Sequence, residues 1–285
     1  MALNITSDHA VSPVVIAVAP NGARRTKDDH PAIPLTATEN AYEAAACLDA
    51  GAAMIHLHVR DKEGGHSLDA DLYRNSIDEI RRAIGDKLIV QVTTEAVGIY
   101  TPAEQMEMVR KVRPEAISAA VRELVPDEAF EDLAANFFEW ASCENIAVQY
   151  ILYDDVDIRR FAELRRRGVL PDGPAFVLYV LGRYAKGQRS TPADLLRFLN
   201  VAAEVEADWH WSVCAFGAQE GSCAMCSVTL GGHARVGMEN NLYLNDGSQT
   251  PGNAALVRQV FDGARLLSRP VADANTAREL LSRII

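Results

Sequence analysis

Short apolar segments alternate with helical segments along the whole chain, and this alternation constrains the fold more than any other feature. Each apolar segment has the length of a strand and is rich in β-branched or aromatic residues, and a stretch with helical periodicity follows it. The eight expected strands span residues 14–20, 54–60, 88–94, 116–122, 147–153, 175–182, 209–216 and 234–240. Eight strand–helix repeats in about 250 residues are what a closed parallel barrel requires.

Capping residues indicate where several of the intervening helices begin and end. Thr101 and Thr191 each precede a proline, which is typical of a helix start, and Thr38 is expected to cap the helix after the first strand. Gly51 and Gly85 are expected to end the first two helices. The segment ANTARELLSRI predicts one more helix after the eighth strand–helix unit.

The main alternative fold is an open, doubly wound sheet, which often carries a glycine-rich phosphate loop after its first strand. The corresponding segment here, PNGARR, contains a single glycine. We therefore predict an α/β fold, a (β/α)8 TIM barrel with one additional C-terminal helix, formed by a single domain over residues 1–285.

Charge and composition exclude several classes of function. The chain has 285 residues and a formal net charge of −11, and an acidic surface repels nucleic-acid phosphates and anionic lipids. No apolar run approaches the roughly 20 residues that a membrane-spanning helix needs. The first residues lack the features of a signal peptide, and the five cysteines suggest no disulfide framework. We expect a cytoplasmic protein that binds small molecules and neither nucleic acid nor membranes.

The sharpest chemical signal lies in the second expected strand. Active-site residues of barrel enzymes sit at the C-terminal ends of the strands, and side chains alternate in direction along a strand. His56, His58 and Arg60 share one face of this strand, and the residues between them are apolar. Two imidazoles on alternate positions can bind one ion, and neutral imidazole suits zinc. The alternative interpretation is a pair of hydrogen-bonded histidines in the core.

The eighth expected strand supplies a third metal ligand. Arg235 and Glu239 point in the same direction, and Glu239 stands at the C-terminal end of a strand that closes the barrel near the first and second strands. Two histidines and one carboxylate form a three-ligand site with an open position, the usual arrangement for catalytic zinc. The alternative is a structural ion pair between Glu239 and Arg60 or Arg235.

Further polar residues are expected at the same end of the barrel. Thr93 is placed to orient a substrate oxygen, and Glu95 could act as a base or ligand or lie in solvent. Arginines after the first strand suggest an anionic substrate, although they could also be ordinary surface residues. We assign substrate binding to four residues, Asn21, Arg24, Arg60 and Ser118.

Four segments carry a recognisable combination of motifs: NGARRTKDDHPAIPLTATE, AGAAMIHLHVRD, QVTTEAVG and TLGGHARVGMENNLY. Together they resemble the β-keto acid cleavage enzymes, from about residue 14 to the C-terminus. The resemblance implies a zinc-bearing (β/α)8 barrel that forms homotetramers. It also implies a reaction in which a β-keto acid and acetyl-CoA give acetoacetate and a new acyl-CoA by a retro-Claisen step. The zinc ligands would be His56, His58 and Glu239, with catalytic roles for Arg235 and Thr93.

Three positions depart from the family pattern. The characterised family member has acidic residues where this chain has Arg24, Ile151 and Asn240. Those carboxylates bind a cationic amino group or assist proton transfer, so their replacement argues against an aminated substrate. It favours a neutral or anionic distal group. We count Asn240 among the catalytic candidates and name Glu95 as the candidate for the replaced base.

Other kinds of protein share parts of this pattern. Metal-dependent hydrolases place H-x-H on the first strand and add histidines on strands five and six, and those two strands have none here. A metal-dependent aldolase or lyase that acts on a small carboxylate without CoA fits the same residues, and CoA dependence separates it. A non-catalytic metal binder is disfavoured by the cluster of polar residues. Cobalt, nickel or manganese would fit the three ligands as well as zinc.

Overall fold

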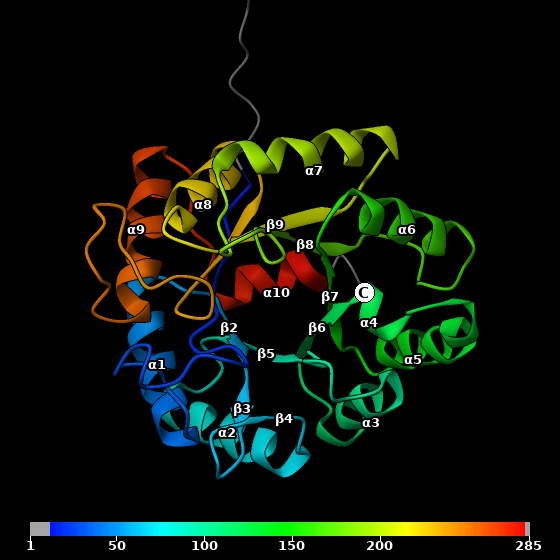
Figure 1. Ribbon diagram of the computed structural model, residues 1–285, viewed down its shortest axis with the longest axis horizontal. Helices are drawn as coiled ribbons and strands as arrows, with labels where there is room; N and C mark the ends of the chain where they lie inside the picture. The colour runs from blue at the N-terminus through cyan, green and yellow to red at the C-terminus, as the bar shows by residue number, and fades with distance from the viewer. Residues whose placement is uncertain (1–11, 283–285) are drawn as a thin grey trace, which may run out of the picture.

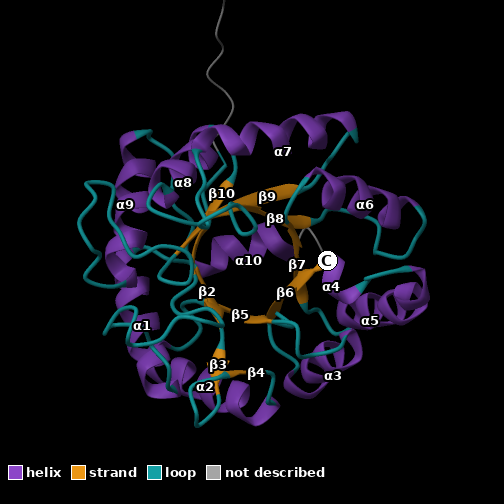
Figure 2. Ribbon diagram, in the orientation of Figure 1, coloured by secondary structure: helices purple, strands orange, loops and turns teal. Residues whose placement is uncertain are grey.

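The computed structural model describes residues 12–282. Its parallel strands close into a barrel with helices around it (Figures 1 and 2). In order around the barrel the strands are β1 (Ile16–Val18), β10 (His233–Val236), β9 (His210–Ala215), β8 (Phe176–Leu181), β7 (Ala147–Leu152), β6 (Ala116–Ala120), β5 (Ile89–Thr93) and β2 (Met54–Leu57). This topology confirms the predicted (β/α)8 barrel.

The helices follow the strands in the expected places. They are α1 (Ala37–Ala50), α2 (Ala70–Ile84), α3 (Pro102–Val112), α4 (Val121–Leu124), α5 (Glu131–Cys143), α6 (Asp155–Arg166), α7 (Pro192–Glu204), α8 (Glu220–Thr229), α9 (Asn253–Leu266) and α10 (Ala274–Ser282). A 3₁₀ turn, Glu128–Phe130, precedes α5, and α10 is the predicted additional helix. Within residues 12–282, no helix is both long enough and apolar enough to span a membrane.

The start of α1 differs from the prediction. Thr36, and not Thr38, is the capping residue, because its hydroxyl accepts a hydrogen bond from the backbone N–H of Glu39. The Glu39 carboxylate bonds back to the N–H of Thr36, which completes a capping box. The reciprocal bond requires an acid three residues after the cap, and that spacing selects Thr36 over Thr38.

The predicted strands extend past the observed C-terminal ends, and the fourth stops at Ala120 because α4 begins at the next residue. The two largest differences lie in the second and eighth strands. The second strand stops at Leu57, and β3 (Val59–Arg60) instead pairs antiparallel with β4 (His66–Ser67) in a hairpin outside the barrel. The eighth strand stops at Val236, because Gly237 turns the backbone with a φ of 148°. A Cβ atom at Gly237 would lie 2.2 Å from the carbonyl oxygen of Ala19, so this close turn requires glycine. Both differences reshape the mouth of the barrel.

The barrel interior changes from apolar to polar along its axis. Near the N-terminal ends of the strands, Met54, Ile89 and Phe176 pack in one cluster with Ala277 and Leu281 of α10. In Figure 1 this helix crosses the middle of the ring of strands. Further along the strands, several buried side chains are polar, namely those of His56, Gln91, Ser118, Gln149 and Arg235. The apolar end closes the barrel, and the polar end leaves groups available for chemistry.

Candidate metal centre and substrate pocket

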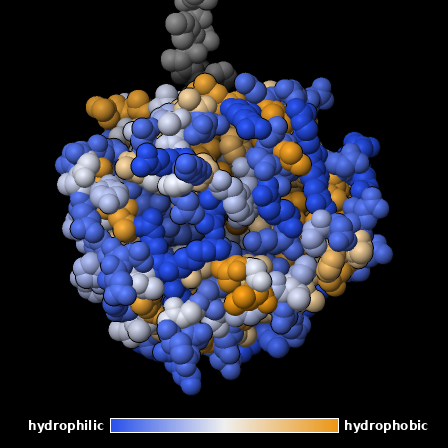
Figure 3. All heavy atoms as spheres, in the orientation of Figure 1, coloured by the Kyte–Doolittle hydropathy of each residue, from blue (hydrophilic) through white to orange (hydrophobic). Residues whose placement is uncertain are grey.

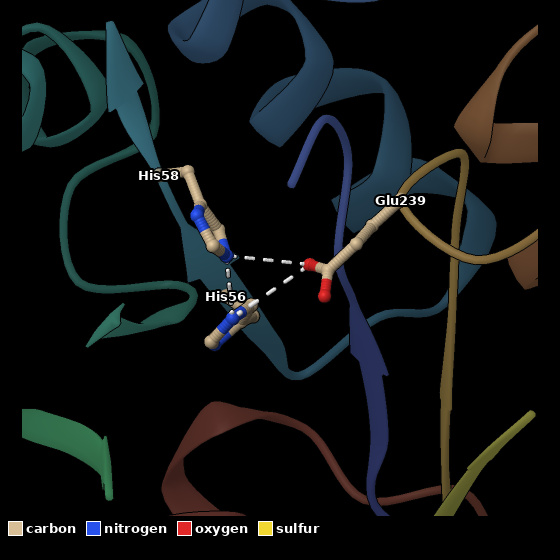
Figure 4. Close-up of side chains that lie close together, drawn as sticks. All are labelled: His56, His58 and Glu239. Atoms are coloured by element: carbon tan, nitrogen blue, oxygen red, sulfur yellow. Dashed lines mark hydrogen bonds and ion pairs between the residues drawn. The ribbon is translucent and has the colours of Figure 1, made fainter. Parts of the chain in front are cut away.

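His56, His58 and Glu239 converge at the mouth of the barrel (Figure 4). The histidines project from the end of β2, and Glu239 reaches them from the loop after β10. The two His Nε2 atoms lie 3.0 Å apart, and Glu239 Oε2 lies 3.7 Å from that of His56 and 3.4 Å from that of His58. Donors bound at about 2.0–2.1 Å to one tetrahedral ion are expected roughly 3.4 Å apart. The spacing therefore fits a single ion.

The hydrogen bonds of His56 prepare it to bind a metal. Its Nδ1 lies 2.9 Å from Oε1 of Gln91, and because that oxygen only accepts, Nδ1 carries the proton and Nε2 keeps its lone pair. Nε2 of Gln91 donates in turn to Oε1 of Gln149 at 3.2 Å, which orients the amide. Burial, reinforced by the charge of Arg235, lowers the pKa of His56 well below its usual value. The ring is therefore neutral at neutral pH.

Gln91 is a positioning residue that the sequence prediction did not assign. It is paired with His56 in the register between β2 and β5, which places the two side chains beside each other. The sequence does indicate that Gln91 points inward, because it lies two positions before Thr93 on the same strand and side chains alternate in direction. A lone glutamine inside a barrel carries no further indication of a metal site.

Glu239 is ionised although it is largely buried. Burial alone would raise the pKa of its carboxyl group, but the charge of Arg235 and the contacts with His58 and His56 hold the pKa well below the usual range. Oε1 accepts a hydrogen bond from Nη2 of Arg235 at 3.2 Å, whereas Oε2 has no hydrogen-bond partner within residues 12–282 and lies toward the histidines. The ion-pair and metal-ligand interpretations are thus compatible, because each uses a different oxygen.

Two residues outside the predicted set fix the loop that carries Glu239. Glu220 of α8 accepts a hydrogen bond from the N–H of Gly237 at 2.9 Å, and Asn253 of α9 accepts one from the N–H of Met238 at 2.7 Å. Glu220 is buried, and burial raises the pKa of its carboxyl group to about 8. Both residues begin helices, where polar side chains are common as caps, and so the sequence contains no distinct signal of this role.

Arg235 is a buried cation with unused hydrogen-bond donors. Its side chain is 4% exposed, and Nη2 donates to Glu239 and, at 3.4 Å, to the sulfur of Cys214. Among the described residues, Nε and Nη1 have no hydrogen-bond partner. Buried donors are almost always paired, so these two N–H groups indicate a ligand with acceptor oxygens, such as a carboxylate or an oxyanion.

Two adjoining pockets lie around these residues, and Figure 3 shows a hollow bordered by hydrophilic residues near the centre of the molecule. The inner pocket is lined by His56, His58, Thr93, Glu95, Ile151, Tyr153, Val180, Arg183, Phe216, Arg235 and Glu239. The outer pocket is lined by Asn21, Gly22, Ala23, Arg24, Arg25, Glu95, Arg183, Gln188, Phe216 and Glu239. The shared residues, Glu95, Arg183, Phe216 and Glu239, stand between the two.

Most of the residues singled out in the sequence come together here. Thr93, Glu95 and Arg235 line the inner pocket with the three candidate metal ligands. Asn21 and Arg24 line the outer pocket, and Nη1 of Arg24 bonds to Oε1 of Glu95 at 2.8 Å. The side-chain nitrogen of Asn21 donates to the carbonyls of Pro34 and His58, so this residue also fastens the loop after β1 to the end of β2.

Three of the sequence candidates lie outside the linings of both pockets. Arg60 donates to backbone carbonyls within residues 21–25, which holds the loop after β1 in place. The reason is that β2 ends before Arg60, so this residue no longer shares the inward direction of His56. Ser118 and Asn240 are fully buried, and their side-chain polar atoms have no hydrogen-bond partner within the described part of the chain.

Comparison with known proteins gives relatives along almost the whole chain. The 3-keto-5-aminohexanoate cleavage enzyme of Acetoanaerobium sticklandii is 30% identical over 271 residues, which cover 94% of this chain and 97% of that protein. The 3-oxoadipate:acetyl-CoA acetyltransferase of Cupriavidus necator is 28% identical over 276 residues, with 94% of each chain covered.

The fold and the family are both supported by these comparisons. The ternary complex of ObcA with a C4-CoA adduct and oxalate superposes with a TM-score of 0.72 at 15% identity, over 88% of this chain and 68% of that one, and supports the barrel fold. The sequence pattern that defines the β-keto acid cleavage enzymes matches residues 13–282. The expected carbon–carbon bond-cleaving enzyme is thereby confirmed, and the chain belongs to the β-keto acid cleavage enzyme family.

Proposed function

We propose that this protein is a zinc-dependent transferase that converts a β-keto acid and acetyl-CoA into acetoacetate and a new acyl-CoA. The observation that carries the proposal is the three-donor site of His56, His58 and Glu239 beside the unpaired N–H groups of Arg235. Two of the relatives are named as an acetyl-CoA acetyltransferase and an acetyl-CoA acetone transferase, which supports acetyl-CoA as the co-substrate.

The donor set favours zinc as the metal. Two imidazoles and one carboxylate with an open position are typical of catalytic zinc, and the ion would supply a Lewis acid that polarises the ketone oxygen of the substrate. The chain prepares both kinds of donor. Gln91 keeps Nε2 of His56 free of its proton, and Arg235 helps to keep Glu239 ionised.

Arg235 and Thr93 are assigned to the oxygens of the substrate. The guanidinium of Arg235 would bind the carboxylate of the β-keto acid or stabilise the oxyanion that develops during carbon–carbon exchange. The hydroxyl of Thr93 accepts a hydrogen bond from the N–H of Glu95 at 3.1 Å and keeps its own proton to donate to a substrate oxygen. Both side chains line the inner pocket with the metal ligands.

The proposed reaction exchanges one carbon–carbon bond for another. A base removes a proton from the carbon between the two carbonyl groups of the β-keto acid, and the enolate attacks the acetyl thioester and releases CoA thiolate. The thiolate adds to the distal ketone carbon, and the bond from that carbon to the former enolate carbon breaks. The distal part leaves as a new acyl-CoA, and the remaining carbanion takes up a proton to become acetoacetate.

Glu95 is the candidate base, and replacing it tests this role. The Glu95→Gln variant is expected to lower kcat by about 10²- to 10⁴-fold, because the amide cannot accept the substrate proton. Zinc content is expected to stay unchanged, since Glu95 is not one of the three converging donors. Steady-state kinetics and metal analysis will measure both, with Glu107→Gln, on a 56% exposed side chain, as the control. Full turnover by Glu95→Gln would show that another group is the base.

A substrate panel tests the proposed function directly. Each of several β-keto acids would be incubated with the zinc-loaded protein and acetyl-CoA, and acetoacetate and acyl-CoA would be followed together. We expect at least one substrate to give both products in equal amounts, and only with the thioester present. Cleavage without CoA would establish the aldolase, lyase or hydrolase alternative instead. No acetoacetate from any member would reject the cleavage reaction.

We also propose that residues 1–285 form a single catalytic domain, and that the protein works in the cytoplasm as a homotetramer. The barrel strands and the helices around them follow one another along the described part of the chain, which supports the single domain. The tetramer rests on the resemblance to the family, and the mass of the native assembly in solution will test it. A monomeric mass at working concentration would contradict it.

A further inference from the structure

We propose that Arg183 binds a second, distal carboxylate on the substrate, and that this enzyme therefore acts on 3-oxo diacids. This inference rests on the proposed function, because it assumes that a β-keto acid occupies the inner pocket. It adds a specificity residue that stands outside the sequence candidates and outside the metal centre.

Arg183 is a largely buried cation at the junction of the two pockets. It follows Leu181, the last residue of β8, by two positions, and its side chain is 15% exposed. It lines the inner pocket together with the metal ligands and also lines the outer pocket. A guanidinium in such a place has lost much of its hydration and gains most from an anionic partner.

The two ends of the loop that carries Arg183 lie close together, and an aromatic ring lies beside its guanidinium. At Gly182, where φ is 78°, a Cβ atom would lie 2.7 Å from the carbonyl oxygen of Arg189. Ser190 Oγ donates to the carbonyl of Phe216 at 2.8 Å, which fastens the loop to the end of β9. The guanidinium carbon lies 5.4 Å from the centre of the Phe216 ring, within the range of a cation–π contact.

The protein itself uses little of the binding capacity of Arg183. Its one ion pair with a described residue is to Oε1 of Glu95, at a long 3.4 Å, while the same oxygen is held by Arg24 at 2.8 Å. Arg24 therefore neutralises Glu95, and Arg183 keeps donors for another acid. By contrast, Arg60 lines neither pocket and is committed to backbone carbonyls.

The wall beside Arg183 suits a carbon chain. Ile151, Val180 and Phe216 line the inner pocket with apolar surface, opposite in character to the metal ligands and Arg235. A substrate whose keto-acid end lies at the metal centre would place its methylene groups on this wall and its far end toward Arg183. A 3-oxo diacid has an anion at that far end, and an aminated substrate would meet a like charge.

The phosphates of CoA are the other anions that this reaction brings to the barrel. They are separated from the thioester by the long pantetheine arm, so an arginine that shares the inner pocket with the metal ligands is better placed for an anion on the substrate. The experiment distinguishes the two sources through separate KM values for the β-keto acid and for acetyl-CoA.

The test compares two six-carbon substrates, 3-oxohexanoate and 3-oxohexanedioate, which differ only in the distal carboxylate. For the diacid, Arg183→Gln is expected to lower kcat/KM by about 10- to 100-fold through a higher KM, and Arg183→Lys to restore part of it. The KM for the monoacid and the KM for acetyl-CoA are expected to change by no more than about threefold, because the monoacid lacks the distal carboxylate. Arg189→Gln, on an exposed side chain of the same loop, is the matched control and should behave as the wild type.

Several results would overturn the inference while the proposed function stands. One is an equal rise, in the Arg183→Gln variant, of the KM values for both substrates. Another is a rise in that variant confined to the KM of acetyl-CoA. The third is a higher kcat/KM of the wild-type enzyme for the monoacid than for the diacid. If no β-keto acid is turned over, the proposed function itself fails. Calorimetric titration of the diacid into the zinc-loaded protein without acetyl-CoA still decides the role of Arg183. A Kd raised about 10-fold or more by Arg183→Gln supports it, and an unchanged Kd rejects it.

Discussion

A Glu239→Gln variant will lose its metal and its activity together. Glutamine keeps the size of the side chain and an oxygen that can accept from Arg235, but it removes the anionic donor that lies 3.4 Å and 3.7 Å from the two His Nε2 atoms. A Lewis acid stabilises developing charge by several kcal/mol, so kcat/KM should fall by about 10³-fold or more. Metal analysis after dialysis and steady-state kinetics will measure the two losses.

The expected losses of metal and of kcat/KM require that the Glu239 carboxylate binds the metal directly. A carboxylate that only added negative charge to the protein would not produce them. Glu63→Gln removes one negative charge from a side chain that is 68% exposed, in the turn between β3 and β4, and should leave metal content and kcat/KM unchanged. If Glu239→Gln retained a full complement of zinc and normal turnover, the assignment of Glu239 as a metal ligand would be wrong. Glu239→Ala is less suitable, because it leaves the buried charge of Arg235 without a partner.

An Arg235→Lys variant will keep its zinc but lose most of its catalytic power. Lysine retains the positive charge beside Glu239, but it lacks the planar guanidinium, whose Nε and Nη1 have no partner in the described part of the chain. Removing one donor to a developing oxyanion typically lowers kcat by about 10²- to 10³-fold, and we expect a loss of this size in kcat/KM. Kinetics measured alongside zinc content will separate chemistry from metal binding.

Arg269 provides a matched control for a buried arginine. It is also about 4% exposed, but it donates to backbone carbonyls of Val228, Gly231 and Gly232, just before β10 and so at the opposite end of that strand. Arg269→Lys should lower the melting temperature and leave kcat/KM unchanged. The Arg235 assignment would be rejected if Arg235→Lys showed normal kcat/KM with intact zinc, or if both variants lost activity only in proportion to their stability.

The barrel and the inward direction of His56 could be predicted because they depend on local periodicity. Alternation along β2 places His56 on the inner side, and the register with β5 sets it opposite Gln91. The helix starts at Pro102 and Pro192 follow from capping chemistry that acts within four residues. In each of these cases the sequence signal and the structural feature lie within a few residues of each other.

Glu239 reaches the two histidines by a different path from the one that the sequence predicts. Strand alternation was expected to carry this side chain inward, but β10 ends at Val236, and the loop that follows delivers it. The close approach of Gly237 to Ala19 and the hydrogen bonds to Glu220 and Asn253 set the path of that loop. Those contacts join segments that are distant in sequence, so no local pattern records them.

The sequence by itself determined the fold class, the direction of His56 and the kinds of side chain available at the barrel mouth. The tertiary structure alone decided which of them meet: it turned Arg60 away to the loop after β1, paired Glu95 with Arg24 and brought Arg183 to the same pocket. The physical reason is that hydrogen bonding and side-chain alternation act within one element, whereas the position of each loop depends on close packing against loops from other strands.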